Sequence, residues 1–133
     1  MKKLFAVMLA SVMICLVFAG CYMDGRGTYY PDIAEMKDAL DDKGYTVTTD
    51  TIKMEDEEIS VLKADKKDEF IVFYRFETDK YVGEYVDEMK KAHSSYDYLE
   101  SVTNDEKHGN IAYCSTKKAR DHAGIQVVEV KNN

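Results

Sequence analysis

The stretch from Phe70 to Phe76 constrains the fold more than any other part of this chain. Its sequence, FIVFYRF, places apolar or aromatic side chains on both alternating faces, with Arg75 as the exception. Because successive side chains of a strand point to opposite faces, such a strand has to be covered on much of both faces. We therefore predict a strand over Glu69–Phe76 and place it in the middle of a sheet.

Two helices are expected around this strand. Ile33, Met36 and Leu40 recur at helical spacing within residues 31–43, and Gly44 supplies a stop. A second helix, capped by Thr78 or Asp79, is predicted to run to about residue 93. Its apolar stripe consists of Tyr81, Val82, Tyr85, Val86 and Met89.

The remaining elements are short. Thr116 or Ser115 can cap a short helix through His122, which Gly124 ends. Further strands are predicted at residues 45–52, 59–64, 98–103, 111–115 and 125–130. The order is then α-β-β-β-α-β-β-(short α)-β. We predict an α+β fold, with a mostly antiparallel sheet of about six strands and the two main helices on one face. The similar order of the two halves suggests a structural duplication.

The first twenty-one residues have the organisation of an export signal. Lys2 and Lys3 form a positive start, and an apolar run from Leu4 to Gly20 follows. The run is seventeen residues long, at the lower edge of the roughly 17 to 25 that a spanning helix requires. The run ends in the small residues Ala19 and Gly20, which favours cleavage. An ordinary secretory signal and an uncleaved anchor helix are the alternatives.

The segment Phe18-Ala19-Gly20-Cys21 resembles the lipobox of bacterial lipoprotein precursors. The resemblance covers only this signal, and Phe18 stands where Leu is usual. It implies that signal peptidase II recognises Phe18, Ala19 and Gly20 and cuts before Cys21, whose thiol carries diacylglycerol with fatty acids such as palmitate. Two acyl chains anchor a protein stably, whereas one does not. The implied location is the outer side of the cell membrane.

This assignment divides the chain into residues 1–20 as signal peptide, 21–30 as lipidated cysteine and flexible tether, and 31–133 as a single domain. Loss of Lys2 and Lys3 takes the formal net charge from −7 to −9. Such an acidic chain is not expected to bind nucleic acid or anionic lipid headgroups through its surface. Cys114 is then the one cysteine left besides Cys21, so the domain is expected to rely on its core rather than on a disulfide.

Few residues point to chemistry. Cys114 could form a nucleophilic pair with His108 or His122, but the sequence around it alternates like a short buried strand, which favours a small buried hydrophobe. The histidines, His93 included, lack metal-ligand spacing, and no cofactor or metal is expected. The acidic run from Glu55 to Glu58 reads as a solvated turn.

Two surface clusters could recognise a partner. Lys117, Lys118 and Arg120 form the one basic cluster outside the signal, and either an interaction patch or a solvated helix face would explain it. Four tyrosines could form an exposed aromatic patch or could lie at the rim of the core: Tyr29, Tyr30, Tyr96 and Tyr98.

The sequence therefore predicts a lipid-anchored envelope protein, with Cys21 as its membrane attachment and a small non-enzymatic domain that binds a protein or a small ligand. An accessory subunit of a membrane or envelope complex is the alternative. A thiol or hydrolytic enzyme that uses Cys114 is the third hypothesis, from a different class.

Overall fold

The strand predicted to be central, β4 (Glu69–Phe76), has the predicted bounds and lies in the middle of a five-stranded sheet. In the computed structural model of the chain, residues 27–127 are described. The order of strands in the sheet is β2-β3-β4-β6-β5, and each neighbouring pair is antiparallel. The other four strands are β2 (Thr46–Lys53), β3 (Glu58–Lys66), β5 (Tyr98–Asp105) and β6 (Gly109–Ser115). The α+β class is confirmed, and the order of elements is close to the one predicted.

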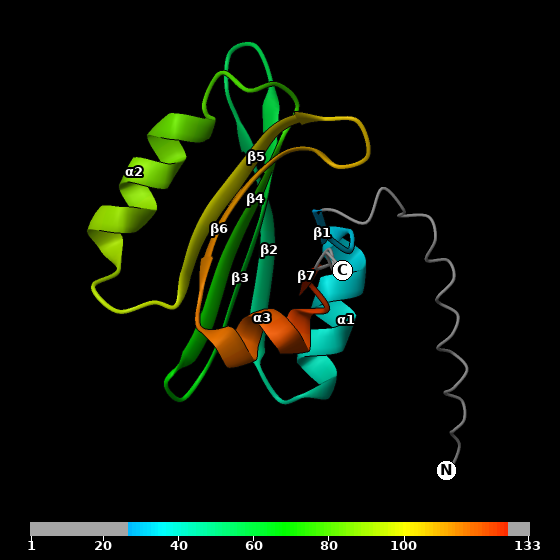
Figure 1. The fold of residues 1–133 in the computed structure, drawn as a ribbon, viewed down its shortest axis with the longest axis vertical. Helices are drawn as coiled ribbons and strands as arrows, with labels where there is room; N and C mark the ends of the chain where they lie inside the picture. The colour runs from blue at the N-terminus through cyan, green and yellow to red at the C-terminus, as the bar shows by residue number, and fades with distance from the viewer. Residues whose placement is uncertain (1–26, 128–133) are drawn as a thin grey trace, which may run out of the picture. The chain divides into compact units, whose positions relative to one another are not determined.

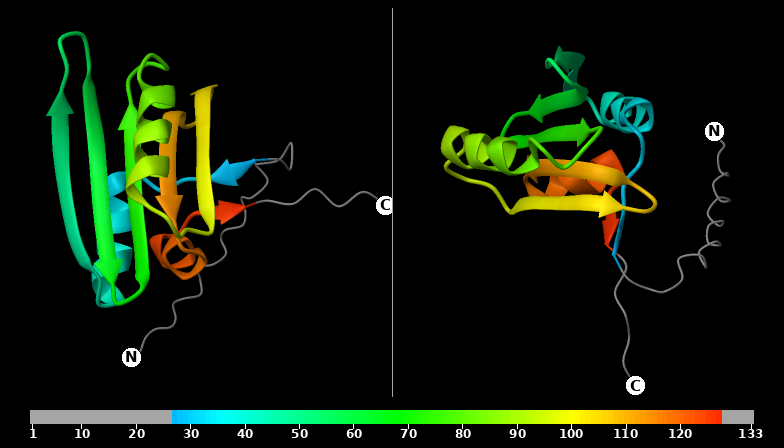
Figure 2. Two further views of the ribbon diagram at one scale, coloured as in Figure 1. Left: turned by 90° about the vertical axis from the view of Figure 1, so that its left-hand side faces the viewer. Right: turned by 90° about the horizontal axis from the view of Figure 1, so that it is seen from above.

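Helices cover both faces of this sheet, as Figures 1 and 2 show. Helix α2 (Val82–Ala92) packs on one face, which we call the α2 face, while α1 (Ile33–Asp42) and α3 (Lys117–Ala123) pack on the other. The prediction that both main helices share one face is therefore wrong. The reason lies in β4, whose apolar side chains alternate between the two faces and provide a core for a helix on each.

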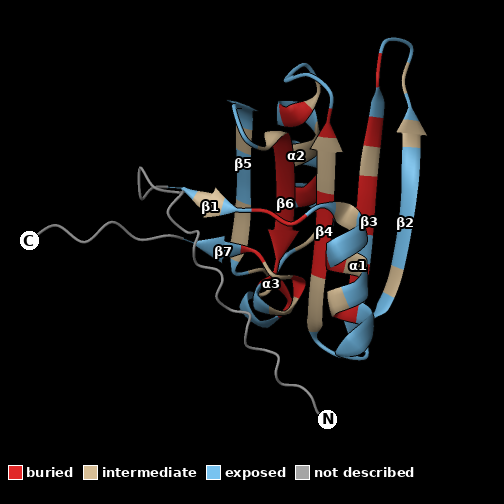
Figure 3. Ribbon diagram, turned by 90° about the vertical axis from the view of Figure 1, so that its right-hand side faces the viewer, coloured by how far each residue is buried: buried red, intermediate tan, exposed pale blue. Residues whose placement is uncertain are grey.

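Two hydrophobic cores result. The α1/α3 core includes Leu62, Phe73 and Tyr113 from the sheet, all fully buried, with Met36 and Leu40 from α1. The α2 core is smaller and is built from Ile59, Val72, Phe76, Val82, Met89, Ala112 and Cys114. Figure 3 shows how burial is distributed, with the inner strands mostly buried and β2 mostly exposed.

The helix ends follow the expected signals in part. Asp32 caps α1 in a capping box with Glu35, in which each side chain accepts from the other residue's backbone N–H. Gly124 ends α3 as predicted, at a left-handed φ of 91° that a residue with a Cβ rarely adopts. Helix α2 begins later than predicted, at Val82, and its N-cap residue, Tyr81, makes no side-chain capping bond.

The ends of the described range differ from the prediction. Strand β7 (Gln126–Val127) pairs with β1 (Thr28–Tyr29) in a separate two-stranded sheet, so the expected sixth strand of the main sheet is missing from it. Residues 128–130 of the predicted last strand lie outside the described residues. Ordered structure also begins before Pro31, since Tyr30 is buried in the α1/α3 core. The predicted flexible tether is therefore wrong for residues 28–30.

The sheet order places α1-β2-β3 and α2-β5-β6 on the two sides of β4. A rotation by half a turn about β4 would exchange these two groups and also exchange the faces that their helices cover. The structural duplication stays a prediction, because a shared arrangement of elements does not establish a shared origin.

Candidate functional site on the α2 face

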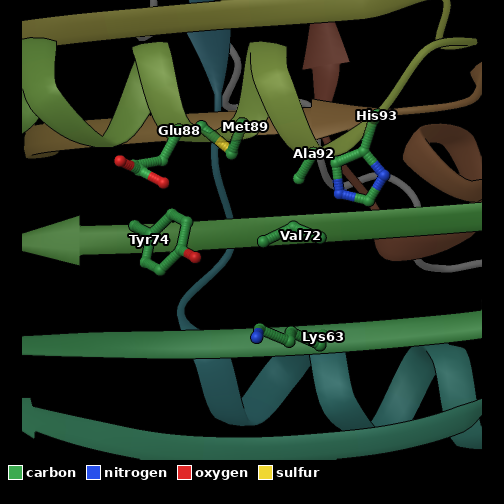
Figure 4. Close-up of a pocket in the computed structure, with 7 residues that line it drawn as sticks. All are labelled: Lys63, Val72, Tyr74, Glu88, Met89, Ala92 and His93. Carbon is green, nitrogen blue, oxygen red and sulfur yellow. The ribbon is translucent and has the colours of Figure 1, made fainter.

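The α2 face is hollowed along one side of helix α2. A hollow of about 270 Å³ lies between the helix and the sheet, and Figure 4 shows the side chains that line it. Its floor is formed by Lys63, Val72 and Tyr74 from β3 and β4. Its wall is formed by four residues at the C-terminal half of the helix and just after it, Glu88, Met89, Ala92 and His93.

A second hollow, of about 260 Å³, lies over β2 and β3 and also reaches Tyr74. It is lined by Thr48, Thr49, Asp50, Ile52, Val61, Lys63 and Tyr74. Because the two hollows share Lys63 and Tyr74, they adjoin at these side chains. We call the union of these lining residues the α2-face groove.

The groove exists because α2 covers only part of its face. On β3, Ile59, Val61 and Lys63 share this face, and the first two are buried while Lys63 is exposed. On β2, Thr48 and Asp50 face the same way and are exposed. The exposure of Lys63, Thr48 and Asp50 shows that the helix leaves this part of β2 and β3 uncovered.

Burial tunes two titratable groups in the groove. The pKa of His93 is lowered, first by burial and then by the positive charge of Lys63. Its ring also stacks on Phe70, with centroids 4.6 Å apart. The pKa of Tyr74 is raised, first by burial and then by the neighbouring Tyr85 and Glu88. His93 is therefore mostly neutral and Tyr74 protonated at neutral pH, which leaves Lys63 as the cationic group of the groove.

Cys114 is sealed in the α2 core. It is fully buried on β6, and burial raises the pKa of its thiol to about 11. The two histidines suggested as its partners lie on the other face. His122 is hydrogen-bonded to the Tyr45 hydroxyl at 2.9 Å, and the ring of His108 packs edge-on against Tyr30 of the α1/α3 core. The structure therefore does not bring Cys114 together with either of them, and a protonated, buried thiol is a poor nucleophile.

The predicted basic cluster is divided by the fold. Lys117 and Lys118 are exposed, whereas Arg120 is only 9% exposed and belongs to the interior. The Arg120 guanidinium lies 3.4 Å from the centre of the Tyr98 ring and donates from Nη1 to the Tyr113 hydroxyl at 3.3 Å. One helical turn places residue 120 on the inward side of α3, so the interaction patch of three residues is wrong.

The two lysines lie beside acids. Lys117 Nζ is 3.2 Å from Asp121, and the Lys117 backbone N–H donates to Asp97 at 2.7 Å. A hollow of about 330 Å³ at this end of α3 is lined by Glu69, Asp97, Lys117, Lys118 and Asp121. Three acids beside two lysines leave no excess of positive charge for an anionic partner.

The acidic run is more than a solvated turn. Glu57 is only 6% exposed, and its carboxylate accepts from the backbone N–H of Glu77 at 3.2 Å and from the Thr78 hydroxyl. Asp56 pairs with Lys80 at 2.5 Å. These contacts hold the loop between β4 and α2, and Thr78, expected as a helix cap, is used here instead. Within residues 27–127, no group of three or more His, Cys, Asp or Glu side chains is placed to hold a metal ion.

The four tyrosines do not gather in one exposed patch. Tyr30 is buried in the α1/α3 core, Tyr98 lies under Arg120, and Tyr96 packs against the α2 core. Tyr29, in β1, is 41% exposed. The interpretation as core rim therefore holds for Tyr96 and Tyr98, which are both half-buried.

The residues of the lipobox-like segment, Phe18, Ala19, Gly20 and Cys21, lie outside the described residues. In the described part of the chain, no helix has the length and apolar character needed to cross a membrane. Comparisons with protein families, with curated proteins and with solved structures find no match to this chain.

Sequence reasoning missed the groove itself. Lys63 and Tyr74 were assigned to strands without a functional role. The signal that could have found them is the lysine in β3 on the same face as Ile59 and Val61, next to a half-buried tyrosine in β4.

Proposed function

We propose that this protein is a lipoprotein of the bacterial envelope, held on the outer side of the cell membrane through Cys21, whose domain binds a partner or a ligand and catalyses no reaction. The anchor is supported by the order of positive start, apolar run and small residues before Cys21. The observation that carries the binding role is the α2-face groove, where Lys63 and Tyr74 are accessible beside a wall of mixed apolar and polar side chains.

The groove favours binding over catalysis by its chemistry. It combines one lysine, the carboxylates of Asp50 and Glu88, a neutral imidazole and a phenol with apolar surface, and the Cys114 thiol on the same face is sealed. Two shallow hollows of this size suit a side chain or a small polar molecule rather than an enclosed cofactor. An accessory subunit of an envelope complex is the alternative role, and the same groove would then contact the other subunit.

The anchor is tested by fractionation of cells that produce the full chain, Cys21→Ser or Cys15→Ser. We expect Cys21→Ser to lose processing and lipid labelling, and Cys15→Ser to behave as the wild type. Globomycin, which inhibits signal peptidase II, is expected to block processing of the wild type. If neither the wild type nor Cys21→Ser is lipidated or cleaved and both remain in the membrane fraction, the segment is an uncleaved helix. If the wild type is found in the soluble fraction, the segment is an ordinary secretory signal. Phe18→Leu is expected to be processed faster.

The binding role is tested by photo-crosslinking in intact cells. A photoreactive residue replaces Tyr74 in the groove or, as the matched control, Lys118 on α3. A discrete crosslinked species from position 74 alone supports a protein partner. Native mass spectrometry of the purified protein detects a small ligand that Lys63→Ala releases. If neither a crosslink nor a retained ligand depends on the groove, the proposed role is wrong.

A further inference from the structure

Strand β2 is an open edge of the sheet. It pairs with β3 over its whole length, from Thr46 to Lys53, without a register shift, and none of its residues is a proline. No other described strand pairs with its outer side. Six of its eight residues are exposed. A long, regular edge of this kind presents a row of unused backbone donors and acceptors.

The direction of these backbone groups follows from three observations. The Phe70 carbonyl accepts from the backbone N–H of Thr116, just after β6, and the Phe70 N–H donates to the Thr116 hydroxyl, so the backbone of Phe70 points toward β6. Because backbone direction alternates along a strand, Val72 also points toward β6, and its partner Lys63 points away from β4 and toward β2. The Lys63 carbonyl indeed accepts from the Thr48 hydroxyl. The even-numbered residues of β2 therefore bond to β3, and the odd-numbered residues, Val47, Thr49, Thr51 and Lys53, direct their backbone outward.

One outward donor is occupied by its own neighbour. The Thr51 N–H donates to the Asp50 carboxylate at 2.8 Å, which agrees with its direction away from β3. Asp50 thus places a negative charge at the middle of the edge. The one lysine of β2, Lys53, lies 3.6 Å from the Glu58 carboxylate, which offsets its charge.

The opposite edge of the sheet is interrupted. Strand β5 changes register between Val102 and Asp105, and Asn104 adopts a left-handed φ of 54°. The Asn104 N–H is also taken by the Asn110 side chain at 2.7 Å. A break in register disrupts the ladder and makes an edge less able to pair with another strand. The two edges of one sheet therefore differ, and β2 is the one left regular.

We propose that β2 receives an extended, basic segment of a partner protein as an added strand, in antiparallel or parallel orientation. The inference rests on the proposed binding function and names its partner. The N–H and C=O groups that point outward along a straight edge can pair with those of another extended backbone. A basic segment is favoured because the chain carries a net charge of −7 and Asp50 lies at the centre of the edge.

A second copy of this chain fits less well. Two β2 strands paired through their odd-numbered residues about a two-fold axis at residue 50 would set Asp50 opposite Asp50, and any such pairing joins two acidic molecules. A lysine or arginine from a partner strand would instead donate to the Asp50 carboxylate, in place of the Thr51 N–H.

The groove would add specificity to this backbone pairing. Thr48, Asp50 and Ile52 of β2 line the second hollow, on the face that their side chains share. Alternate side chains of an added strand point to that same face and so reach the rim of the hollow. Backbone bonds would then supply affinity, and the rim residues would select the side chains.

The test uses the full chain purified in detergent and fluorescent octapeptides of alternating Lys and Val, alternating Glu and Val, and the Lys-Val peptide with alternate backbone nitrogens methylated. We expect the Lys-Val peptide to bind and to protect residues 46–53 from hydrogen exchange. The Glu-Val and methylated peptides are expected to bind at least about ten-fold more weakly. Equal binding of the methylated peptide, or protection from hydrogen exchange outside residues 46–53, would overturn the proposal. A complete lack of peptide binding would also overturn it, and so would self-association of the chain through β2.

Variants locate the contact. Thr51→Pro removes one outward N–H, which an edge strand tolerates, and is expected to weaken binding about ten-fold. Thr51→Val keeps the N–H and is its matched control. Asp50→Lys is expected to reverse the preference between the Lys-Val and Glu-Val peptides. If Thr51→Pro does not fold, the methylated peptide on the wild type decides the same point. Because the assay is done in detergent, its failure leaves the membrane anchor untouched.

Discussion

The two faces of the sheet use the same strands in different ways. On the α1/α3 face, two helices close over the strands, and the buried Arg120 and Tyr113 bond to each other, with the exposed Glu100 accepting from the Tyr113 hydroxyl at the rim. On the α2 face, a single helix covers the β4, β6 and β5 side and leaves the groove beside β2 and β3. Neighbouring residues of one strand therefore belong to a closed interior on one side and to an accessible surface on the other.

This difference teaches how a small chain can keep both stability and a site. Burial of apolar area stabilises the fold, and the closed face holds the larger core. The open face can then expose Lys63 and Tyr74 without loss of the fold. The following experiments break or sharpen the comparison.

The largest expected difference is the reactivity of thiols at two depths of the α2 face. In a chain with Cys15→Ser and Cys21→Ser, Cys114 should react with a maleimide only on unfolding, because it is fully buried and its pKa is raised to about 11. Ala92→Cys, added at the exposed wall of the groove, should react at least about a thousand-fold faster, given ordinary folding stability. Mass spectrometry of labelled peptides measures both rates.

A comparable rate at the two positions would contradict the sealed core. Urea serves as the control, since Cys114 is expected to react as fast as the added cysteine once the chain is unfolded. Labelling of Cys114 at a rate set by global unfolding would show that the α2 face opens only as a whole.

The next largest effect separates neighbouring residues of β4. Phe73→Ala, on the closed face, is expected to lower the free energy of unfolding by about 3 to 5 kcal/mol, because Phe73 is fully buried between two layers. Tyr74→Ala, on the open face, should lower it by about 1 to 2 kcal/mol through loss of its contacts with Tyr85 and Phe76. Denaturant unfolding measures both values.

Tyr74→Phe is the matched control for the second change and is expected to keep nearly all of the stability, because it retains the ring. Equal losses for Phe73→Ala and Tyr74→Ala would mean that the α2 face is as closed as the other. The comparison between faces would then have no energetic basis.

A smaller effect divides the basic residues of α3. Arg120→Ala is expected to lower the free energy of unfolding by about 2 kcal/mol, since it removes a charged donor from the Tyr113 hydroxyl and the contact with the Tyr98 ring. Lys118→Ala, at an exposed position on the same helix, should change it by less than about 0.5 kcal/mol. Thermal and denaturant unfolding provide the measurement. Similar changes in the free energy of unfolding at the two positions would instead support an exposed basic patch that includes Arg120.

The sequence was sufficient for β4 and for most element types because the apolar alternation of FIVFYRF and the caps of α1 and α3 are local signals. It was insufficient for the placement of α2, since a sequence pattern shows that a helix has an apolar stripe but not which face of the sheet receives it. Arg120 shows the same limit. Its charge suggested an exposed position, but it lies on the inward side of the short helix α3 and is buried.

The groove depended on a relation between distant residues. Lys63 and His93 are thirty positions apart, and only the packing of α2 over β4 brings both to one hollow. Glu57 was likewise misjudged, because its partners, Glu77 and Thr78, follow a whole hairpin later. Contacts of this kind are fixed by tertiary packing rather than by local propensity.

The smallest expected effect is a dependence of stability on pH that His93 contributes from the open face. The pKa of His93 is lowered in the folded state from 6.5 by burial and by Lys63, so the unfolded chain binds the proton more readily. The contribution of His93 to the free energy of unfolding is therefore complete above pH 6.5 and is lost as the pH falls through the lowered folded value.

His93→Phe keeps a ring to stack on Phe70 but cannot titrate, and its unfolding free energy should fall less steeply below pH 6.5 than that of the wild type. His108, whose pKa is also lowered by burial, titrates on the closed face in both chains, so the difference between the two curves isolates His93. Denaturant unfolding between pH 5 and 8, with NMR titration of the imidazole, measures it. Parallel curves, or an imidazole that titrates above 6.5, would show that the groove does not desolvate His93. A charged ligand bound in the groove would shift the pKa of His93, which makes His93 a reporter for occupancy of the open face.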